Sequence, residues 1–148
     1  MAAERFVDHY LAALLAQANS LISTEFHQVV KQQGLQVPEW RLLASLAGGE
    51  AISVGRLAQI TLAQQPTVTR QLDRMQKKGL IQRIEHRADR RVTLALITAS
   101  GQALADKLIG QALAHEQRVL SPFGAERAAL LKTTLREIID AHRVDSER

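Results

Sequence analysis

Basic side chains gather in the middle of this sequence, between positions 56 and 91. Nine arginine and lysine residues in this segment oppose three acidic residues, so the segment carries a charge of +6. Because the whole chain has a formal charge of +4, the remaining residues sum to −2. Guanidinium and ammonium groups clustered in this way bind polyanions, although a charge run is more often only a solvated face. The basic residues of the segment are Arg56, Arg70, Arg74, Lys77, Lys78, Arg83, Arg87, Arg90 and Arg91.

The sequence offers little for catalysis or metal binding. It has no cysteine, which excludes disulfides, thiolate metal sites and a cysteine redox sensor. It contains no glycine-rich phosphate loop and no nucleophile elbow, and its acidic residues are expected at solvated positions on helix faces. Its five histidines, at positions 9, 27, 86, 115 and 142, are scattered and form no pair with metal-ligand spacing. We therefore predict no enzyme activity, no cofactor and no metal site.

The elements that must position the basic segment are predicted to be mainly helices. Apolar residues recur at helical intervals from position 4 to about 31, and Gly34 and Pro38 end this pattern. Two short runs rich in β-branched residues, joined by the polar loop 86–91, predict a β-hairpin. Helices are expected at 4–31, from 39 to about 47, at 54–60, 64–78 and 98–120, and in a last stretch ending near 142, with strands at 80–85 and 92–97.

The helix expected at 64–78 has two contrasting faces. Val68, Leu72 and Met75 follow one another at helical spacing and should face the core. The opposite arc carries hydroxyl and guanidinium donors, which suit base edges and phosphates. A short helix capped by Ser53 and a tight turn precede this helix, and the hairpin follows directly after Gly79. This order predicts an α+β fold, mostly α, built on a winged helix-turn-helix.

Three runs in this region make the resemblance specific. They read QPTVTRQLDRM at 65–75, GLIQR at 79–83 and DRRVTLALITASG at 89–101. Together with the long first helix and the two closing helices, they resemble the multiple-antibiotic-resistance regulator (MarR) family over essentially the whole chain. The resemblance implies a triangular homodimer in which two winged domains straddle a palindromic operator in double-stranded DNA. It also implies that Asp89 and Arg91 act together in the wing, where the carboxylate would brace an arginine entering the minor groove.

These considerations give a set of predicted DNA contacts and a domain division. We expect one domain over 1–148, with dimerisation helices at 1–34 and 98–148 and the winged helix-turn-helix at 39–97. The stripes on the dimerisation helices carry more apolar surface than one winged domain can cover, which favours a homodimer. The predicted DNA-binding residues are Gln65, Thr67, Thr69, Arg70, Arg74, Lys77, Arg87, Asp89, Arg90 and Arg91.

The family resemblance further implies a small, often phenolic, anion bound between the dimerisation and winged parts. His9, Trp40 and Arg41 are the candidate ligand-binding residues, with the alternatives that Trp40 is a core residue and Arg41 is simply solvated. The predicted function is a sequence-specific dimeric repressor released by this effector. A winged module that binds a protein partner and a metal-responsive regulator are the alternatives. The first residues do not resemble a signal peptide, and we expect a cytoplasmic protein with no membrane partner.

Overall fold

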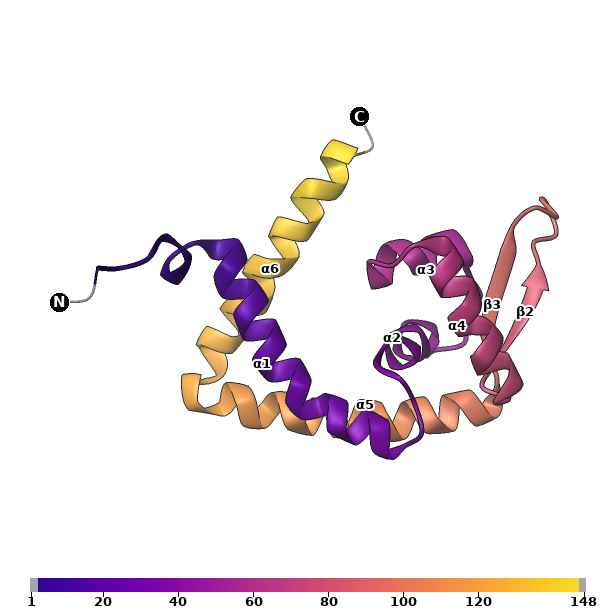
Figure 1. The fold of residues 1–148 in the computed structure, drawn as a ribbon, viewed down its shortest axis with the longest axis horizontal. Coiled ribbons are helices and arrows are strands. Elements are labelled where there is room, and N and C mark those ends of the chain that lie inside the picture. The colour runs from indigo at the N-terminus through magenta and orange to yellow at the C-terminus, as the bar shows by residue number, and fades with distance from the viewer. Residues whose placement is uncertain (1–2, 147–148) are drawn as a thin grey trace. The chain divides into compact units, whose positions relative to one another are not determined.

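The computed structural model describes residues 3–146, and the side chains up to residue 143. The chain divides into two compact units, Met1–Gln111 and Ala112–Arg148, which are taken one at a time below. Its elements are η1 (Phe6–Asp8), α1 (Leu11–Gln32), α2 (Val37–Leu46), β1 (Ile52–Ser53), α3 (Val54–Thr61), α4 (Gln65–Lys77), β2 (Ile81–Glu85), β3 (Thr93–Ile97), α5 (Ala99–Leu120), η2 (Ser121–Phe123) and α6 (Ala125–Ser146). The mostly helical fold with a small hairpin confirms the predicted fold class (Figure 1).

The first helix begins later than the sequence predicts. Instead of a helix from position 4, the chain forms a single 3-10 turn, and α1 starts at Leu11 after an extended Tyr10. The Asp8 carboxylate accepts a hydrogen bond from the Arg5 backbone N–H at 3.3 Å, which stabilises the turn. The apolar period runs through this break unchanged, so the pattern alone gave the wrong start.

The second helix begins at Val37, two residues before the expected Glu39. Pro38 lies in the first turn, where a helix needs no backbone N–H from it, so this proline starts the helix instead of preceding it. Gln36 is the N-cap residue, and its backbone N–H donates to the Glu39 carboxylate at 3.0 Å. A local capping interaction between residues three apart therefore sets the start of α2, and the apolar pattern did not reveal it.

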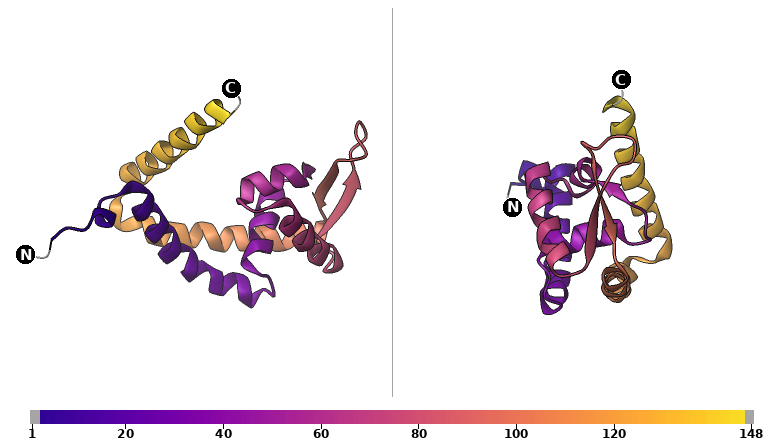
Figure 2. Two further views of the ribbon diagram at one scale, coloured as in Figure 1. Left: turned by 45° about the horizontal axis from the view of Figure 1, so that its top comes forward. Right: turned by 90° about the vertical axis from the view of Figure 1, so that its right-hand side faces the viewer.

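A three-stranded antiparallel sheet forms the wing, with strand order β1-β3-β2. The hairpin register pairs Ile81 with Ile97 and Glu85 with Thr93, and β1 adds the pair Ile52 with Ala95. The sequence did not predict β1, because two residues are too few to show alternation. On β3 the buried side chains are Ala95 and Ile97, and the alternate residues Leu94 and Leu96 are only half-buried. Figure 2 shows the loop of the hairpin extending beyond the neighbouring helices α3 and α4.

The core of the first unit lies where α2, α3, α4 and the sheet meet. Val68, Leu72 and Met75 have no exposed surface, which confirms the predicted inward face of α4. Leu42 and Leu57 meet the same core from α2 and α3 and are also fully buried. Packing on three sides fixes the rotation of α4 about its own axis, and it thereby decides which side chains of this helix are exposed.

In the second unit the end of α5 turns into α6 through η2. Pro122 lies in the first turn of η2 and Gly124 adopts a left-handed φ of 82°, so both residues interrupt the helix as the sequence predicts. Lys132 of α6 pairs with Glu116 of α5 at 2.7 Å across this elbow. α6 runs to Ser146, a turn beyond the predicted end. Its large apolar side chains Leu130, Leu131 and Ile139 are about half exposed or more.

Candidate nucleic-acid interface

The outward face of α4 consists of polar and basic side chains. Gln65, Thr69, Arg70, Arg74 and Lys77 are exposed, and Thr67 is half-buried. The short helix α3 packs against α4 and helps to fix which of its faces is exposed. Ser53 caps α3 by accepting a hydrogen bond from the Arg56 N–H at 3.1 Å. The turn that follows is closed by Leu62 in the left-handed region, with φ of 55°. This left-handed residue reverses the chain between α3 and α4, as a helix-turn-helix requires.

The predicted contact residues of α4 differ in how far they are already engaged. Arg70 makes only a long contact, 3.5 Å from its Nη2 to the Thr67 hydroxyl, so its guanidinium is available to a partner. Arg74 instead donates from Nη1 to the Gln36 side-chain oxygen at 2.9 Å, across to the start of α2. The Thr69 hydroxyl donates to the Gln65 backbone oxygen at 3.0 Å. Arg70 is thus the least restrained arginine on this face.

An ion pair that the sequence did not predict attaches the hairpin to α4. Arg83 of β2 donates from Nε to Gln76 at 2.7 Å and from Nη2 to the Asp73 carboxylate. Both acceptors lie on the exposed side of α4, and the arginine side chain is itself 28% exposed. The two hydrogen bonds to one guanidinium restrict the angle between helix and hairpin. The charges were visible in the sequence, but their pairing across a helix end was not.

At the tip of the hairpin, Asp89 and Arg91 form the contact that the sequence predicted. The Asp89 carboxylate accepts hydrogen bonds from the Arg91 Nε at 3.1 Å, from its Nη2 at 3.3 Å and from its backbone N–H at 3.0 Å. The side-chain bonds first, and then the backbone bond, hold the pKa of Asp89 below its ordinary value. The Asp89 carboxylate therefore orients the Arg91 side chain, which is still 91% exposed to solvent.

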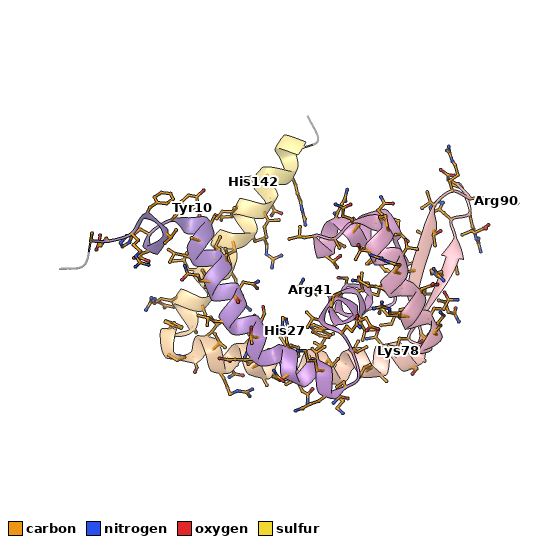
Figure 3. The ribbon with its side chains drawn as sticks, in the orientation of Figure 1. Tyr10, His27, Arg41, Lys78, Arg90 and His142 are labelled. Carbon is orange, nitrogen blue, oxygen red and sulfur yellow. The ribbon has the colours of Figure 1, made fainter. Side chains whose placement is uncertain are left out.

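The remaining wing residues are free of such restraint. Arg87 and Arg90 are exposed in the loop, where Figure 3 shows Arg90 at the outer end of the hairpin. Between the start of α4 and the hairpin, a hollow of about 340 Å³ is lined by residues of both elements, among them Gln65, Thr69 and Arg91. The structure therefore brings the start of α4 and the wing arginine to the same side of the unit. Polar groups of α4 and the positive charge of Arg91 therefore face one hollow, and the other basic side chains of α4 continue along its exposed face.

A solved structure provides the decisive comparison. A MarR family transcriptional regulator from Silicibacter pomeroyi DSS-3, SPO1453, is 40% identical to this chain, with a TM-score of 0.82. The match covers 93% of this chain and 98% of that one. The chain belongs to the MarR family of transcriptional regulators. A model of the MarR family also matches residues 33–92, which cover α2, α3, α4 and β2 and end just before β3.

Two further MarR-like relatives bear on the question of effectors. The homoprotocatechuate degradative operon repressor of Escherichia coli is 29% identical over 129 residues, covering 87% of each chain. The structure of NadR in complex with 4-hydroxyphenylacetate is 25% identical, with a TM-score of 0.80, and the match covers 93% of this chain and 97% of that chain. The first protein is named for homoprotocatechuate, and the second was solved with 4-hydroxyphenylacetate.

The three effector residues predicted from the MarR resemblance do not come together in one chain. Trp40 is half-buried and packs on Phe26 of α1, with ring centroids 5.5 Å apart, and the neighbouring Arg41 is exposed. His9 instead lies before α1, 3.3 Å from Glu4. The helix between Leu11 and Phe26 rises roughly 22 Å, which separates His9 from Trp40. Within one chain His9 is thus far from Trp40 along α1, and the joint role of His9, Trp40 and Arg41 in effector binding stays a prediction.

His27 is a further histidine of α1, and it lies near α2. It follows Phe26 on α1, and Figure 3 shows it next to Arg41 of α2. Burial lowers the pKa of His27, and the positive charges of Arg41 and then Lys31 lower it further. The His27 imidazole therefore lies within the electrostatic reach of two cations, one residue along α1 from the Phe26 ring that packs on Trp40. Sequence reasoning passed over this histidine because isolated histidines on helices carry no motif.

Metal ions and membranes are two other kinds of partner. Within residues 3–146, no group of three or more histidine or acidic side chains is arranged to hold a metal ion. None of the helices described for this chain is long and apolar enough to cross a membrane.

Proposed function

We propose that this chain is a homodimeric repressor that binds a palindromic operator in double-stranded DNA and is released by a small aromatic acid. The observation that carries the proposal is the pairing of two basic elements in one unit. The exposed face of α4 and the oriented Arg91 lie on the same side, and the Arg83 contacts to Asp73 and Gln76 restrict their relative angle. Such a surface matches a groove and its two phosphate backbones.

In this proposal α4 enters the major groove. Arg70 lies in the second turn of the helix, its guanidinium makes only one long contact, and a guanidinium forms bidentate bonds to guanine. Gln65, Thr67 and Thr69 are nearer the helix start and offer shorter polar groups to base edges and phosphates. Lys77, at the other end, is placed for a phosphate. Arg74 already donates to Gln36 and would contact DNA only with its remaining guanidinium N–H groups.

The wing would enter the neighbouring minor groove. Arg91 suits this role because Asp89 holds its guanidinium while leaving most of the side chain exposed. A narrow minor groove attracts such an arginine mainly through its potential, which depends weakly on sequence. Arg87 and Arg90 flank it and would add phosphate contacts.

The homodimer is supported by apolar side chains that the single chain leaves uncovered. On α1 the residues at 11, 14, 15, 21 and 22 follow helical spacing and are 38% to 72% exposed. On α6 the leucines at 130 and 131 are 65% and 49% exposed. Isolated exposed leucines are ordinary, but stripes of this length on long helices mark an interface. A two-fold dimer would present its two α4 helices to half-sites about one turn of DNA apart.

The effector site would lie at the contact between α1 and α2. Trp40 offers an aromatic face, and Arg41 offers a cation for a carboxylate. A bound carboxylate would also favour the protonated form of His27, because it would offset the charges that now lower the pKa of this residue. Binding of a probe such as 4-hydroxyphenylacetate should therefore be accompanied by proton uptake, and Arg41→Ala should weaken both binding and proton uptake.

The DNA-binding proposal is tested by first selecting an operator from a random duplex pool and then titrating variants. Arg70→Ala should lose about 1–3 kcal/mol on the operator and less on random DNA, since it removes a base contact. Arg91→Ala should weaken both duplexes and flatten the salt dependence by about one unit of slope. Arg136→Ala, an exposed arginine of α6 outside the basic segment, is the matched control. If Arg70→Ala and Arg91→Ala both bind like Arg136→Ala, the interface is not the one proposed.

A further inference from the structure

Glu39 is a charged side chain with no exposed surface, and it is the buried acid of the first unit. Its position corrects the expectation that the acidic residues lie on solvated faces. Burying a carboxylate costs a large desolvation free energy unless it is paired and hydrogen-bonded. Such a group is retained where its contacts do something that an apolar side chain would not do. Its contacts therefore indicate its role.

The Glu39 carboxylate joins three segments of the chain. One oxygen, Oε1, accepts from the Gln36 backbone N–H at 3.0 Å and from the Lys78 Nζ at 3.2 Å, and Oε2 accepts from the same Nζ at 2.9 Å. Lys78 also donates to the Gly34 backbone oxygen at 3.1 Å. The junction between α1 and α2, the first turn of α2 and the end of α4 thus meet at one ammonium group.

A second contact runs parallel to the first. Arg74, one turn before Lys78, donates to the side-chain oxygen of Gln36 at 2.9 Å. The last turn of α4 is therefore attached to the N-cap of α2 by two cations four residues apart. Lys78 is itself the C-cap residue of α4, where a positive charge is favoured by the helix dipole. Figure 3 shows Lys78 at this end of the helix.

The contacts at the C-terminal end of α4 control the position of its N-terminal half. Arg70 lies eight residues, or about 12 Å, from Lys78 along the axis. A pivot of about 5° at Lys78 would move the Arg70 backbone by roughly 1 Å, since displacement grows with the distance from the pivot. Hydrogen bonds to base edges require donor–acceptor distances within a few tenths of an ångström, whereas salt-dependent attraction to phosphates tolerates such a shift. Loss of the attachment should therefore affect sequence-specific contacts more than total attraction.

We infer that Glu39 is a positioning residue that acts through Lys78 to set the pose of α4, and with it the preference for operator over random DNA. This inference rests on the proposed DNA-binding function. It assigns a specificity role to a residue that touches no DNA and lies on the helix that also carries the effector candidates Trp40 and Arg41. The connection gives the α1–α2 junction a direct polar link to the recognition helix.

The test compares Glu39→Gln, Lys78→Met and the double variant with wild type on operator and random duplexes. Glu39→Gln keeps the size of the side chain and an acceptor for the Gln36 N–H. It should weaken operator binding about tenfold and change random binding less than about twofold. The double variant should bind the operator as tightly as the weaker-binding of the two single variants, because both substitutions remove the same contact between Glu39 and Lys78. Lys77→Met is the matched control: it also removes one cation at this helix end, and it should weaken both duplexes alike.

A purely structural role would give a different pattern. If Glu39→Gln weakens both duplexes equally, or keeps the full operator preference while fully folded by circular dichroism, the inference is wrong. Hydrogen exchange at the Gln36 amide reports directly on its bond to Glu39, and Lys78→Met should speed this exchange in a folded protein. Unchanged exchange in Lys78→Met would also overturn the inference. If wild type itself shows no operator preference, the proposed function fails instead.

Discussion

Gly101, at the start of α5, provides a sharp test of how the wing is held beside α4. A Cβ added at this position would lie 2.1 Å from the Leu80 backbone oxygen and 2.9 Å from Cγ1 of Ile97. The same Leu80 oxygen accepts a hydrogen bond from the Thr98 N–H at 3.0 Å, and the Thr98 side chain accepts from the Gly101 N–H. The end of α4, the base of the hairpin and the start of α5 therefore meet at a point with no room for a methyl group.

The expected effect of Gly101→Ala follows from this geometry. The contact with the Leu80 oxygen must open by about 0.9 Å to reach the shortest distances that Cβ atoms tolerate, and the obstacle is backbone. Overpacking of this kind costs about 1–3 kcal/mol, and weakening the Thr98 to Leu80 hydrogen bond adds about 1 kcal/mol. Alanine regains up to about 1 kcal/mol of helix propensity. Gly101→Ala should therefore lower the free energy of unfolding by about 1–4 kcal/mol.

Gly110→Ala, on the same helix, is the matched control. A Cβ at Gly110 meets nothing within 4 Å, so this variant should be more stable than wild type by about 0.5–1 kcal/mol. Urea unfolding of the three proteins at one protein concentration measures both changes, since association would make stability depend on concentration. Gly101→Ala should also bind operator more weakly, because the wing shifts relative to α4. A Gly101→Ala variant as stable as Gly110→Ala would refute the reasoning.

Three further results are expected. Nuclear magnetic resonance titration should give Asp89 a pKa below its ordinary value, and Arg91→Ala should restore the ordinary pKa. Because the folded-state pKa of Asp89 is depressed, its contact with Arg91 stabilises the fold above the unfolded-state pKa. This stabilisation is lost as the pH falls through the folded-state pKa. His27 should titrate below about 6.5, so the free energy of unfolding should fall as the pH drops through 6.5 towards the folded-state pKa. Arg41→Ala should bring this pKa only part of the way back to its ordinary value, because burial is the larger cause of the shift. Leu21→Asp should dissociate the proposed dimer in sedimentation experiments at micromolar concentration; a wild-type protein that sediments as a folded monomer of 16.4 kDa would exclude the dimer.

Much of the candidate site was predictable because its signals are local in the sequence. The inward face of α4 follows from three apolar residues at helical spacing, and the structure buries all three of them. Asp89 and Arg91 are two residues apart in a loop, so their contact needs little from the rest of the fold. Ser53, Gly79 and Thr98 also act on neighbouring residues as caps or helix ends, and they were assigned correctly.

The sequence by itself therefore determined the order of the α-helices and the hairpin, the outward face of α4 and the basic segment, because each depends on residues a few positions apart. Only the tertiary structure decided that Glu39 is buried against Lys78, 39 residues away, and that Arg83 reaches back to Asp73. It also decided that His27 lies close enough to Arg41 for the guanidinium charge to lower its pKa. These pairings depend on how helices and strands pack. An apolar period gives the face that a residue occupies, but only packing sets its height along the helix and the charge that meets it across an interface.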